Sequence, residues 1–269
     1  MSSGKQSKRR RAQVQAPQPR QQLRRRQASP RVLLAALIVI VVAGLGVGLG
    51  VALAGGSGSS LGKVPATGSL TGKLTLPNAA IVHRLFNGVP QRGNALGKAS
   101  APVTMVEYID LQCPYCDQFE LNVLPDLVSR YVKAGAVKIE AIPIAFIGPD
   151  SQRGRLAAIA AAKQNHMFDF MEVLYANQKT ENTGWLSDSM VTRAAASIPG
   201  LDVPKLLADH KTADTATVAK SFDQSAKTAQ VRETPTILVG KTGQSPKQVA
   251  LRSPTDEASV IAAIAAASR

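Results

Sequence analysis

Apolar residues without any charge fill one long run near the start of the chain, over residues 32–54. About 20 apolar residues are enough to cross the hydrocarbon core of a bilayer as a helix, so this run predicts a single transmembrane helix. Residues 55–73 are rich in Gly and Ser, a composition typical of a flexible tether. We therefore predict a linker over 55–84 and one folded domain over 85–269.

Within the predicted domain, a change in the spacing of apolar residues indicates a strand–helix–strand unit. Residues 103–111 are largely apolar and rich in Val, Ile and Tyr, which is typical of a buried strand. The apolar residues that follow recur at every fourth position, namely Phe119, Val123, Leu127 and Tyr131. This spacing predicts an amphipathic helix, and residues 137–146 predict the second strand of a βαβ unit.

The rest of the chain predicts a helical block followed by a second half that returns to the sheet. Helical spacing covers about residues 150–228, and strand patterns return at 236–239 and 249–251. A closing helix is predicted to start with Ser253 as its cap and Asp256 completing a capping box. The predicted fold class is therefore α/β, with a helical insertion between a βαβ half and a ββα half.

Positive charge is concentrated in residues 1–31, which hold ten Lys or Arg and no acidic residue. The full chain has a formal net charge of +14, so residues 32–269 carry only about +4. A basic tail is typical of contact with nucleic acid or an anionic membrane. The apolar run directly after it favours the membrane, and we expect no nucleic-acid partner. Lys and Arg before such a run keep that end in the cytoplasm. This predicts a single-pass cell-membrane protein with an extracytoplasmic domain.

Two interpretations of residues 32–54 remain open. One is an uncleaved signal-anchor, and the other is a signal peptide cut after Ala54, because Ala52-Leu53-Ala54 fits the small-x-small rule. The apolar core of a cleaved peptide is about 7–15 residues long, shorter than this run, so the anchor is favoured. Both interpretations export the domain.

The chain has two cysteines, Cys113 and Cys116, and only two residues separate them. Such a pair can be half of a zinc site, a structural crosslink or a redox dithiol. Zinc needs four ligands, and the chain offers neither further cysteines nor paired histidines, so we expect no metal. A disulfide that closes so short a loop removes little chain entropy from the unfolded state. We therefore interpret the pair as a redox-active disulfide that needs no other cofactor.

The pair lies after a predicted strand and at the start of a predicted helix, which gives its two sulfurs different roles. The N–H groups and the dipole at a helix start favour a thiolate, which makes Cys113 the attacking sulfur. Cys116 lies one turn further into the helix, where it is more buried and resolves the mixed disulfide. Pro114 suits the first helical position, which needs no N–H donor.

The stretch "VTMVEYIDLQCPYCDQFE", together with the later "VRETPTILV", resembles the thioredoxin superfamily and, within it, the DsbA-like thiol–disulfide oxidoreductases of bacteria. The N-terminal anchor and the helical block between the two halves resemble the membrane-tethered members of that group. The resemblance covers about residues 85–269. It implies a thioredoxin fold with a helical insertion, preceded by one transmembrane helix.

The resemblance also implies roles for residues beyond the two cysteines. Thr234 and Pro235 fall where the family has a cis-proline loop that packs against the cysteines and pairs with an extended substrate segment. Glu107 falls where the family has a buried acid that exchanges a proton with the second cysteine. Pro114 and Tyr115 lie between the cysteines, where the family tunes its reduction potential.

The sequence departs from the best-known oxidases of this family at one position near the buried acid. Those oxidases pair the acid with a lysine on the next strand, whereas approximate alignment puts Ala141 there. We therefore expect Glu107 to lack a cationic partner. Asp110 and Asp117, which flank the motif, are expected to be solvated, and either charge would modestly oppose a nearby thiolate.

These observations predict a membrane-anchored, extracytoplasmic thiol–disulfide oxidoreductase, with a monomer as the simplest state. Its expected activity is to pass the Cys113–Cys116 disulfide to reduced exported proteins, after which a membrane redox partner reoxidises the pair. A disulfide reductase or isomerase is the alternative among enzymes. A thioredoxin-fold binding protein or chaperone with a static disulfide is the alternative from another class.

Overall fold

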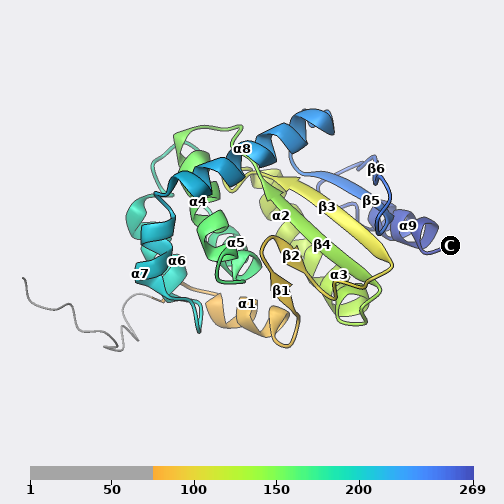
Figure 1. Cartoon of the computed structure of the whole chain (residues 1–269), viewed down its shortest axis with the longest axis horizontal. Helices are drawn as coiled ribbons and strands as arrows, with labels where there is room; N and C mark the ends of the chain where they lie inside the picture. Colours follow the sequence, from red (N-terminus) through yellow and green to blue (C-terminus); the bar gives the residue numbers. More distant parts are fainter. Residues whose placement is uncertain (1–74) are drawn as a thin grey trace, which may run out of the picture. The chain divides into compact units, whose positions relative to one another are not determined.

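The structure is a computed structural model that describes residues 75–269 (Figure 1). The predicted basic tail, the predicted transmembrane helix over 32–54 and most of the predicted linker lie outside the described residues. Within the described range, no helix combines the length and apolar character needed to cross a membrane. Residues 79–84, assigned to the linker on sequence grounds, belong to helix α1 (Ala79–Phe86).

A mixed sheet of six strands lies at the centre of the described region, in the order β1-β2-β4-β3-β5-β6. Its strands are β1 (Gln91–Arg92), β2 (Ala95–Leu96), β3 (Val103–Ile109), β4 (Val137–Pro143), β5 (Thr236–Lys241) and β6 (Lys247–Gln248). The pairing of β3 with β4 is parallel and that of β3 with β5 is antiparallel. Both edges of β3 are therefore hydrogen-bonded, and this strand is central.

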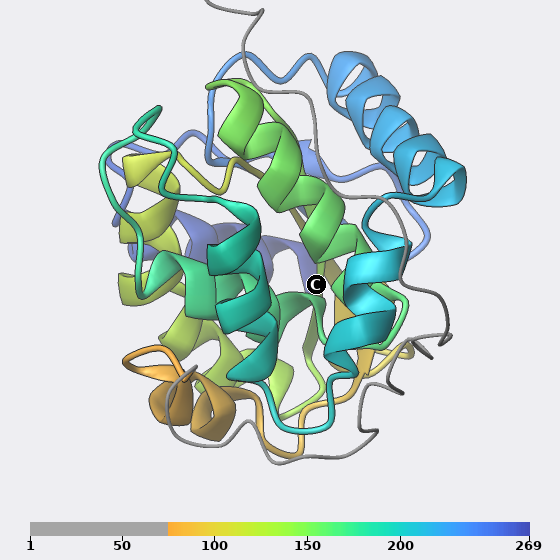
Figure 2. The ribbon, with the colours of Figure 1, turned by 90° about the vertical axis from the view of Figure 1, so that its left-hand side faces the viewer.

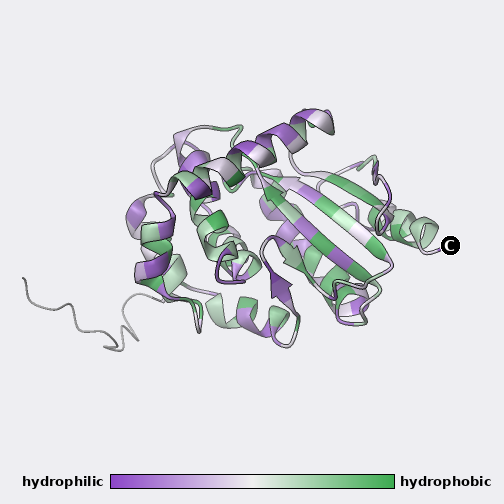
Figure 3. Cartoon of the chain, in the orientation of Figure 1, coloured by the Kyte–Doolittle hydropathy of each residue, from purple (hydrophilic) through white to green (hydrophobic). Residues whose placement is uncertain are grey.

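Helices cover both faces of β3, which explains its nearly continuous apolar sequence. Met105 and Ile109 point into the main hydrophobic core. Val106 and Tyr108 point to the opposite face, where they join a smaller apolar cluster that includes part of helix α8 (Ala213–Thr228). In Figure 3 the central strands carry mostly hydrophobic residues, whereas the outer helix α8 is largely hydrophilic or neutral.

The helices follow the order that the sequence predicts. The remaining ones are α2 (Pro114–Asn122), α3 (Leu124–Leu127), the π-helical turn η1 (Val128–Val132), α4 (Pro149–Ala162), α5 (Met167–Tyr175), α6 (Asp188–Ala196), α7 (Val203–Asp209) and α9 (Glu257–Ala267). Helices α4 to α8 form the insertion between β4 and β5, and Figure 2 shows them facing the viewer. The α1 helix packs against α5 of this insertion.

Two local predictions in the last part of the chain are wrong. The edge strand β6 covers Lys247–Gln248 rather than 249–251. The N–H of Val249 still donates to the Ile237 carbonyl of β5 at 2.8 Å, and the chain then leaves the sheet. The closing helix is capped by Asp256 and not by Ser253. The Arg252 side chain donates two hydrogen bonds of 2.8 Å to the Asp256 carboxylate. That carboxylate also accepts the N–H of Ser259, which fixes the helix start.

Candidate active site

The two cysteines lie where β3 has ended and α2 begins. Cys113 is the N-cap residue of α2 with an extended backbone, and Pro114 occupies the first helical position. Cys116 lies in the first turn and has no exposed surface, whereas Cys113 keeps 5% of its surface exposed. Both side chains are free thiols, which is the reduced form of the pair. Both sulfurs therefore lie at one end of the sheet, next to the end of the buried strand β3.

Hydrogen bonds lower the pKa of the Cys113 thiol from 9.0 to about 6. The largest contribution comes from the Cys116 thiol, which donates to the Cys113 thiolate. Smaller ones come from the Thr234 side chain and from the N–H groups of Tyr115 and Cys116 at the helix start, while burial acts in the opposite direction. At neutral pH, Cys113 is therefore mostly a thiolate.

Burial also raises the pKa of the second sulfur, and there it is the largest effect. It raises the pKa of the Cys116 thiol well above 9.0, and the hydrogen bond to Cys113 raises it further. The N–H of Asp110, 3.5 Å from Cys116 Sγ, offsets this only in part. At neutral pH one sulfur is therefore charged and keeps a small exposed area, while the other keeps its proton inside the core.

The loop before β5 faces the cysteines. The Thr234–Pro235 peptide bond is cis, and the Cys113 thiol donates to the Thr234 carbonyl oxygen at 3.3 Å. Beside it lies a hollow of about 300 Å³, whose lining includes Tyr115, Pro235 and Leu251. The Tyr115 ring is 57% exposed. Thr234, which contacts Cys113, lines this hollow, so the hollow lies directly beside the cysteine pair.

Asp110 is fully buried, so its interpretation as a solvated residue is wrong. Its Oδ1 accepts the N–H of Gln112 at 2.9 Å and the Ser151 hydroxyl at 2.6 Å. Its Oδ2 accepts the N–H groups of Phe146 at 2.7 Å and Ile147 at 3.1 Å. Four donors thus replace water around the carboxylate, and they tie the cysteine loop to the segment that leads into α4.

The helical insertion holds the same loop from the other side. The Tyr175 hydroxyl donates to the Asp110 carbonyl at 3.2 Å. The Gln178 side-chain amide donates to the carbonyls of Leu111 at 3.2 Å and Cys113 at 3.3 Å. The sequence analysis did not identify these residues, because each contact joins positions more than 60 residues apart and leaves no periodic signal.

Glu107 lies on β3 and has no exposed surface. Strand pairing places Ala141 directly opposite it on β4, in agreement with the approximate alignment. The nearby Lys138 donates instead to Glu140 at 2.7 Å. In the described part of the chain, no salt bridge therefore neutralises Glu107.

Two further acids, Glu120 on α2 and Glu172 on α5, are buried near Glu107, and the sequence analysis did not single them out. Burial raises the pKa of Glu107 to about 8 and that of Glu172 to about 7, and it raises the pKa of Glu120 well above 4.5. A signal for Glu120 was available in the sequence. It follows Cys116 by four residues and therefore lies on the same buried side of the helix.

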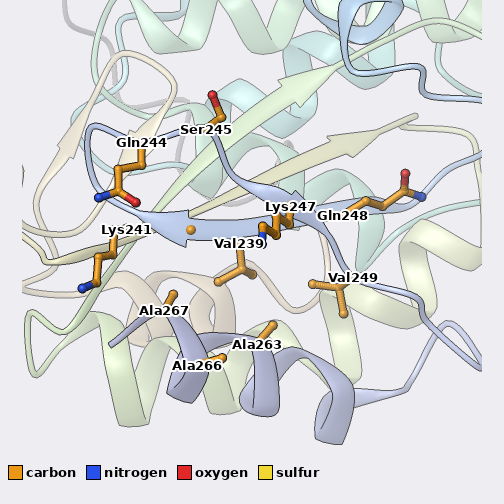
Figure 4. A pocket seen from close by; sticks show the side chains of 11 residues that line it. Val239, Lys241, Gln244, Ser245, Lys247, Gln248, Val249, Ala263, Ala266 and Ala267 are labelled. Carbon is orange, nitrogen blue, oxygen red and sulfur yellow. The ribbon is translucent and has the colours of Figure 1, made fainter. Parts of the chain in front are cut away.

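A second hollow of about 320 Å³ lies between the β5–β6 hairpin and α9 (Figure 4). In Figure 4, Val239 and Val249 point toward Ala263 and Ala267 on the helix. This hollow is at the end of β5 away from Thr236, and no cysteine or acidic residue lines it. The hollow beside Tyr115 is the one next to the cysteines, because its lining includes Thr234, which contacts Cys113. In residues 75–269, no cluster of His, Cys, Asp and Glu side chains is arranged to hold a metal ion.

The family model described as Thioredoxin matches residues 91–250, a segment that contains the cysteine pair, the cis-proline loop and the helical insertion. The chain belongs to the thioredoxin family. The probable disulfide bond formation protein D of Bacillus cereus is 29% identical over 171 residues, which are 59% of this chain and 79% of that protein. Disulfide bond formation protein D of Bacillus subtilis is 30% identical over 148 residues, which are 54% and 66% of the two chains.

Two solved structures share the fold. Oxidised BdbD from Bacillus subtilis superposes with a TM-score of 0.58 at 22% identity, over 67% of this chain and 97% of that one. DsbA from Chlamydia trachomatis gives a TM-score of 0.54 at 16% identity, over 64% and 90% of the two chains. The chain thus has a DsbA-like α/β fold, and its cysteine pair and relatives identify a thiol–disulfide oxidoreductase.

The unequal sulfurs predict which cysteine forms the bond to a substrate. Cys116→Ser is first treated with oxidised glutathione, so that Cys113 carries a mixed disulfide with glutathione. Reduced, unfolded proteins should then displace the glutathione as a thiolate and stay bound to Cys113, because no Cys116 remains to resolve the new disulfide. Cys113→Ser should trap about tenfold less, because the remaining thiol is buried and protonated. Nonreducing electrophoresis followed by mass spectrometry measures the adducts. Equal trapping by the two variants would show that the roles are assigned wrongly.

Proposed function

We propose that the protein is an oxidase that passes its Cys113–Cys116 disulfide to reduced exported proteins. The observation that carries this proposal is the contrast between the two sulfurs, one with a pKa of about 6 beside an open hollow and the other fully buried. A stabilised thiolate favours the reduced form of the pair, and a pair whose reduced form is favoured is a strong oxidant. The Bacillus relatives are named disulfide bond formation proteins, which supports an oxidase rather than a reductase.

The proposed reaction transfers one disulfide in two displacements. A substrate thiolate attacks Cys113 Sγ, the bond between the two cysteines breaks, and Cys116 leaves as a thiolate that takes up a proton. A second substrate thiolate then attacks the substrate sulfur of the mixed disulfide, and Cys113 leaves as a thiolate. The low pKa of Cys113 makes it a good leaving group. The pair now holds two electrons from the substrate, which a membrane redox partner removes.

Several residues around the pair support this reaction in the proposal. Thr234 and Pro235 bind an extended substrate segment beside Cys113, as their position along the hollow supports. Glu107 supplies a proton to the buried Cys116, for which its burial and raised pKa are suited. Pro114 and Tyr115 tune the reduction potential from the first turn of α2. No contact between two copies is needed for these roles, so the proposed unit is a monomer.

The reduction potential of the pair tests the direction of the reaction. Equilibration of the full chain with glutathione buffers at neutral pH, followed by alkylation and mass spectrometry, should give a value much nearer to about −120 mV than to about −270 mV. The same measurement in concentrated guanidinium chloride is the control, because unfolding removes the structural difference between the sulfurs. A folded-state value near −270 mV would indicate a reductase. A pair that does not exchange would indicate a binding protein with a static disulfide.

The proposed location is the cell membrane, with residues 1–31 in the cytoplasm, a signal-anchor over 32–54 and the thioredoxin domain outside. The ten basic residues before an uncharged apolar run support this orientation. A pair of cysteines that cycles through a disulfide also suits an oxidising compartment.

Protease treatment of intact spheroplasts that express the full chain tests this orientation. The domain should be digested without lysis, and a cytoplasmic marker protein in the same cells should survive as the control. Protection of the domain until detergent is added would contradict the proposed location. A soluble form that begins at Gly55 would replace the anchor by a cleaved signal peptide.

A further inference from the structure

Three buried carboxyl groups come from three different elements and meet beside α2. Glu107 is on β3, Glu120 on α2 and Glu172 on α5, and none has more than 2% of its surface exposed. Five of their six oxygens accept no hydrogen bond from an N–H or hydroxyl donor among residues 75–269. Glu120 and Glu172 lie close enough that each affects the pKa of the other.

The groups that surround this cluster do not neutralise it. Asp117 on α2 adds a further negative charge near Glu172. Burial raises the pKa of Tyr175 on α5, and negative charge on Cys116 and on the buried acids Glu120 and Glu172 raises it further, so Tyr175 lies near all three. Together with Ala141 opposite Glu107, these neighbours leave the three carboxyl groups without a cation in the described core. Buried carboxyl groups without a cation keep their protons to a higher pH than exposed ones do.

The cluster reaches the surface at one end. Glu172 lines a groove of about 610 Å³ between α1, α3 and α5, and the cations Arg84 and Lys133 line the same groove. At the other end, Glu107 shares its side of β3 with Met105 and Ile109, in the same hydrophobic core as Cys116. Glu172 thus lies at the groove end of the cluster, and Glu107 lies on the side of β3 that faces the core containing Cys116.

We propose that Glu107, Glu120 and Glu172 form a proton path that connects the buried Cys116 with this groove. The proposal rests on the oxidase function above and names the route by which its protons leave and enter. It assigns Glu120 and Glu172 as positioning residues for protons, which act on Cys116 through Glu107.

Reoxidation of the reduced pair shows where the protons and electrons go in each step. A disulfide oxidant such as oxidised glutathione is attacked by the Cys113 thiolate, one glutathione leaves as a thiolate, and a mixed disulfide forms. Cys116 then gives its proton to Glu107 as Glu107 passes one to Glu120 and Glu120 passes one to the Glu172 carboxylate. The Cys116 thiolate attacks Cys113 Sγ, and the second glutathione leaves as a thiolate. Substrate oxidation runs the same transfer backwards.

The order of the carboxyl pKa values suits this direction of transfer. Glu172 at the groove has a pKa of about 7, Glu107 has one of about 8, and that of Glu120 is raised well above 4.5. As pH rises through about 7, the outermost carboxyl is thus the one that loses its proton to solvent and becomes an acceptor. Below that pH it is protonated, and the path has no acceptor for the Cys116 proton.

The test follows the lifetime of the mixed disulfide when the reduced full chain reacts with excess oxidised glutathione between pH 6 and 9. In the wild type, the rate of its resolution should rise with a midpoint near pH 7. In Glu172→Gln that inflection should be lost, and resolution of the mixed disulfide should be about tenfold slower at pH 7. This effect is smaller than the rate enhancement of about 10²–10⁴-fold that is typical of general acid–base catalysis. Acid quenching, alkylation and mass spectrometry measure the intermediate.

Two further variants make the result specific. Glu107→Gln should lose the same inflection, because it interrupts the path at the sulfur. Asp126→Asn removes an exposed acid of α3 and should leave the profile unchanged. If Glu172→Gln keeps the wild-type profile, or lowers the rate equally at every pH, the proton path is wrong. The oxidase proposal would still stand if the wild type has an oxidising potential.

An infrared pH titration of the wild-type chain keeps the proposal testable if the Gln variants do not fold. Carboxyl groups that remain protonated at pH 6 should titrate near pH 7 to 8, well above exposed Asp and Glu. A spectrum in which every carboxyl group is already ionised at pH 6 would overturn the path without reference to any variant.

Discussion

The unequal environment of two sulfurs that lie one helical turn apart is the constraint on which this site depends. Burial keeps the proton on Cys116, while hydrogen bonds from Cys116 and from the start of α2 stabilise the charge on Cys113. The difference exists because α2 begins at the motif, directly after a strand that is covered on both faces. The place where β3 ends thus gives the two sulfurs their different environments.

The rest of the domain holds this arrangement in place. Asp110 gathers four donors from both sides of the loop, and Gln178 and Tyr175 bind the loop carbonyls from the helical insertion. Thr234 closes the site from the strand β5 side. A loop with this many partners cannot move far as the disulfide opens and closes. The insertion is therefore part of the active site, although it contributes no sulfur chemistry.

The strand, the cysteine turn and the helix after it could be predicted because their information is local and periodic. The order of the βαβ half, the helical block and the second half follows from the same periodicity. Ala141 was placed by the approximate alignment with oxidases of the family. Asp110 could not be placed, because three of its four donors come from segments that meet it only in the folded chain. Glu172 was missed for the same reason, and Asp256 was overlooked as a cap because Arg252 positions it through side-chain contacts.

The difference between the sulfurs is tested most directly by the pH dependence of their alkylation. Iodoacetamide reacts with the reduced wild-type chain at a series of pH values, and peptide mass spectrometry gives the rate at each cysteine. The account predicts modification of Cys113 with a midpoint near pH 6, since its lowered pKa makes the reactive thiolate available from there upward. Cys116 should stay unmodified throughout that range. A Cys113 midpoint near pH 9, or equal modification of both cysteines at neutral pH, would contradict the account.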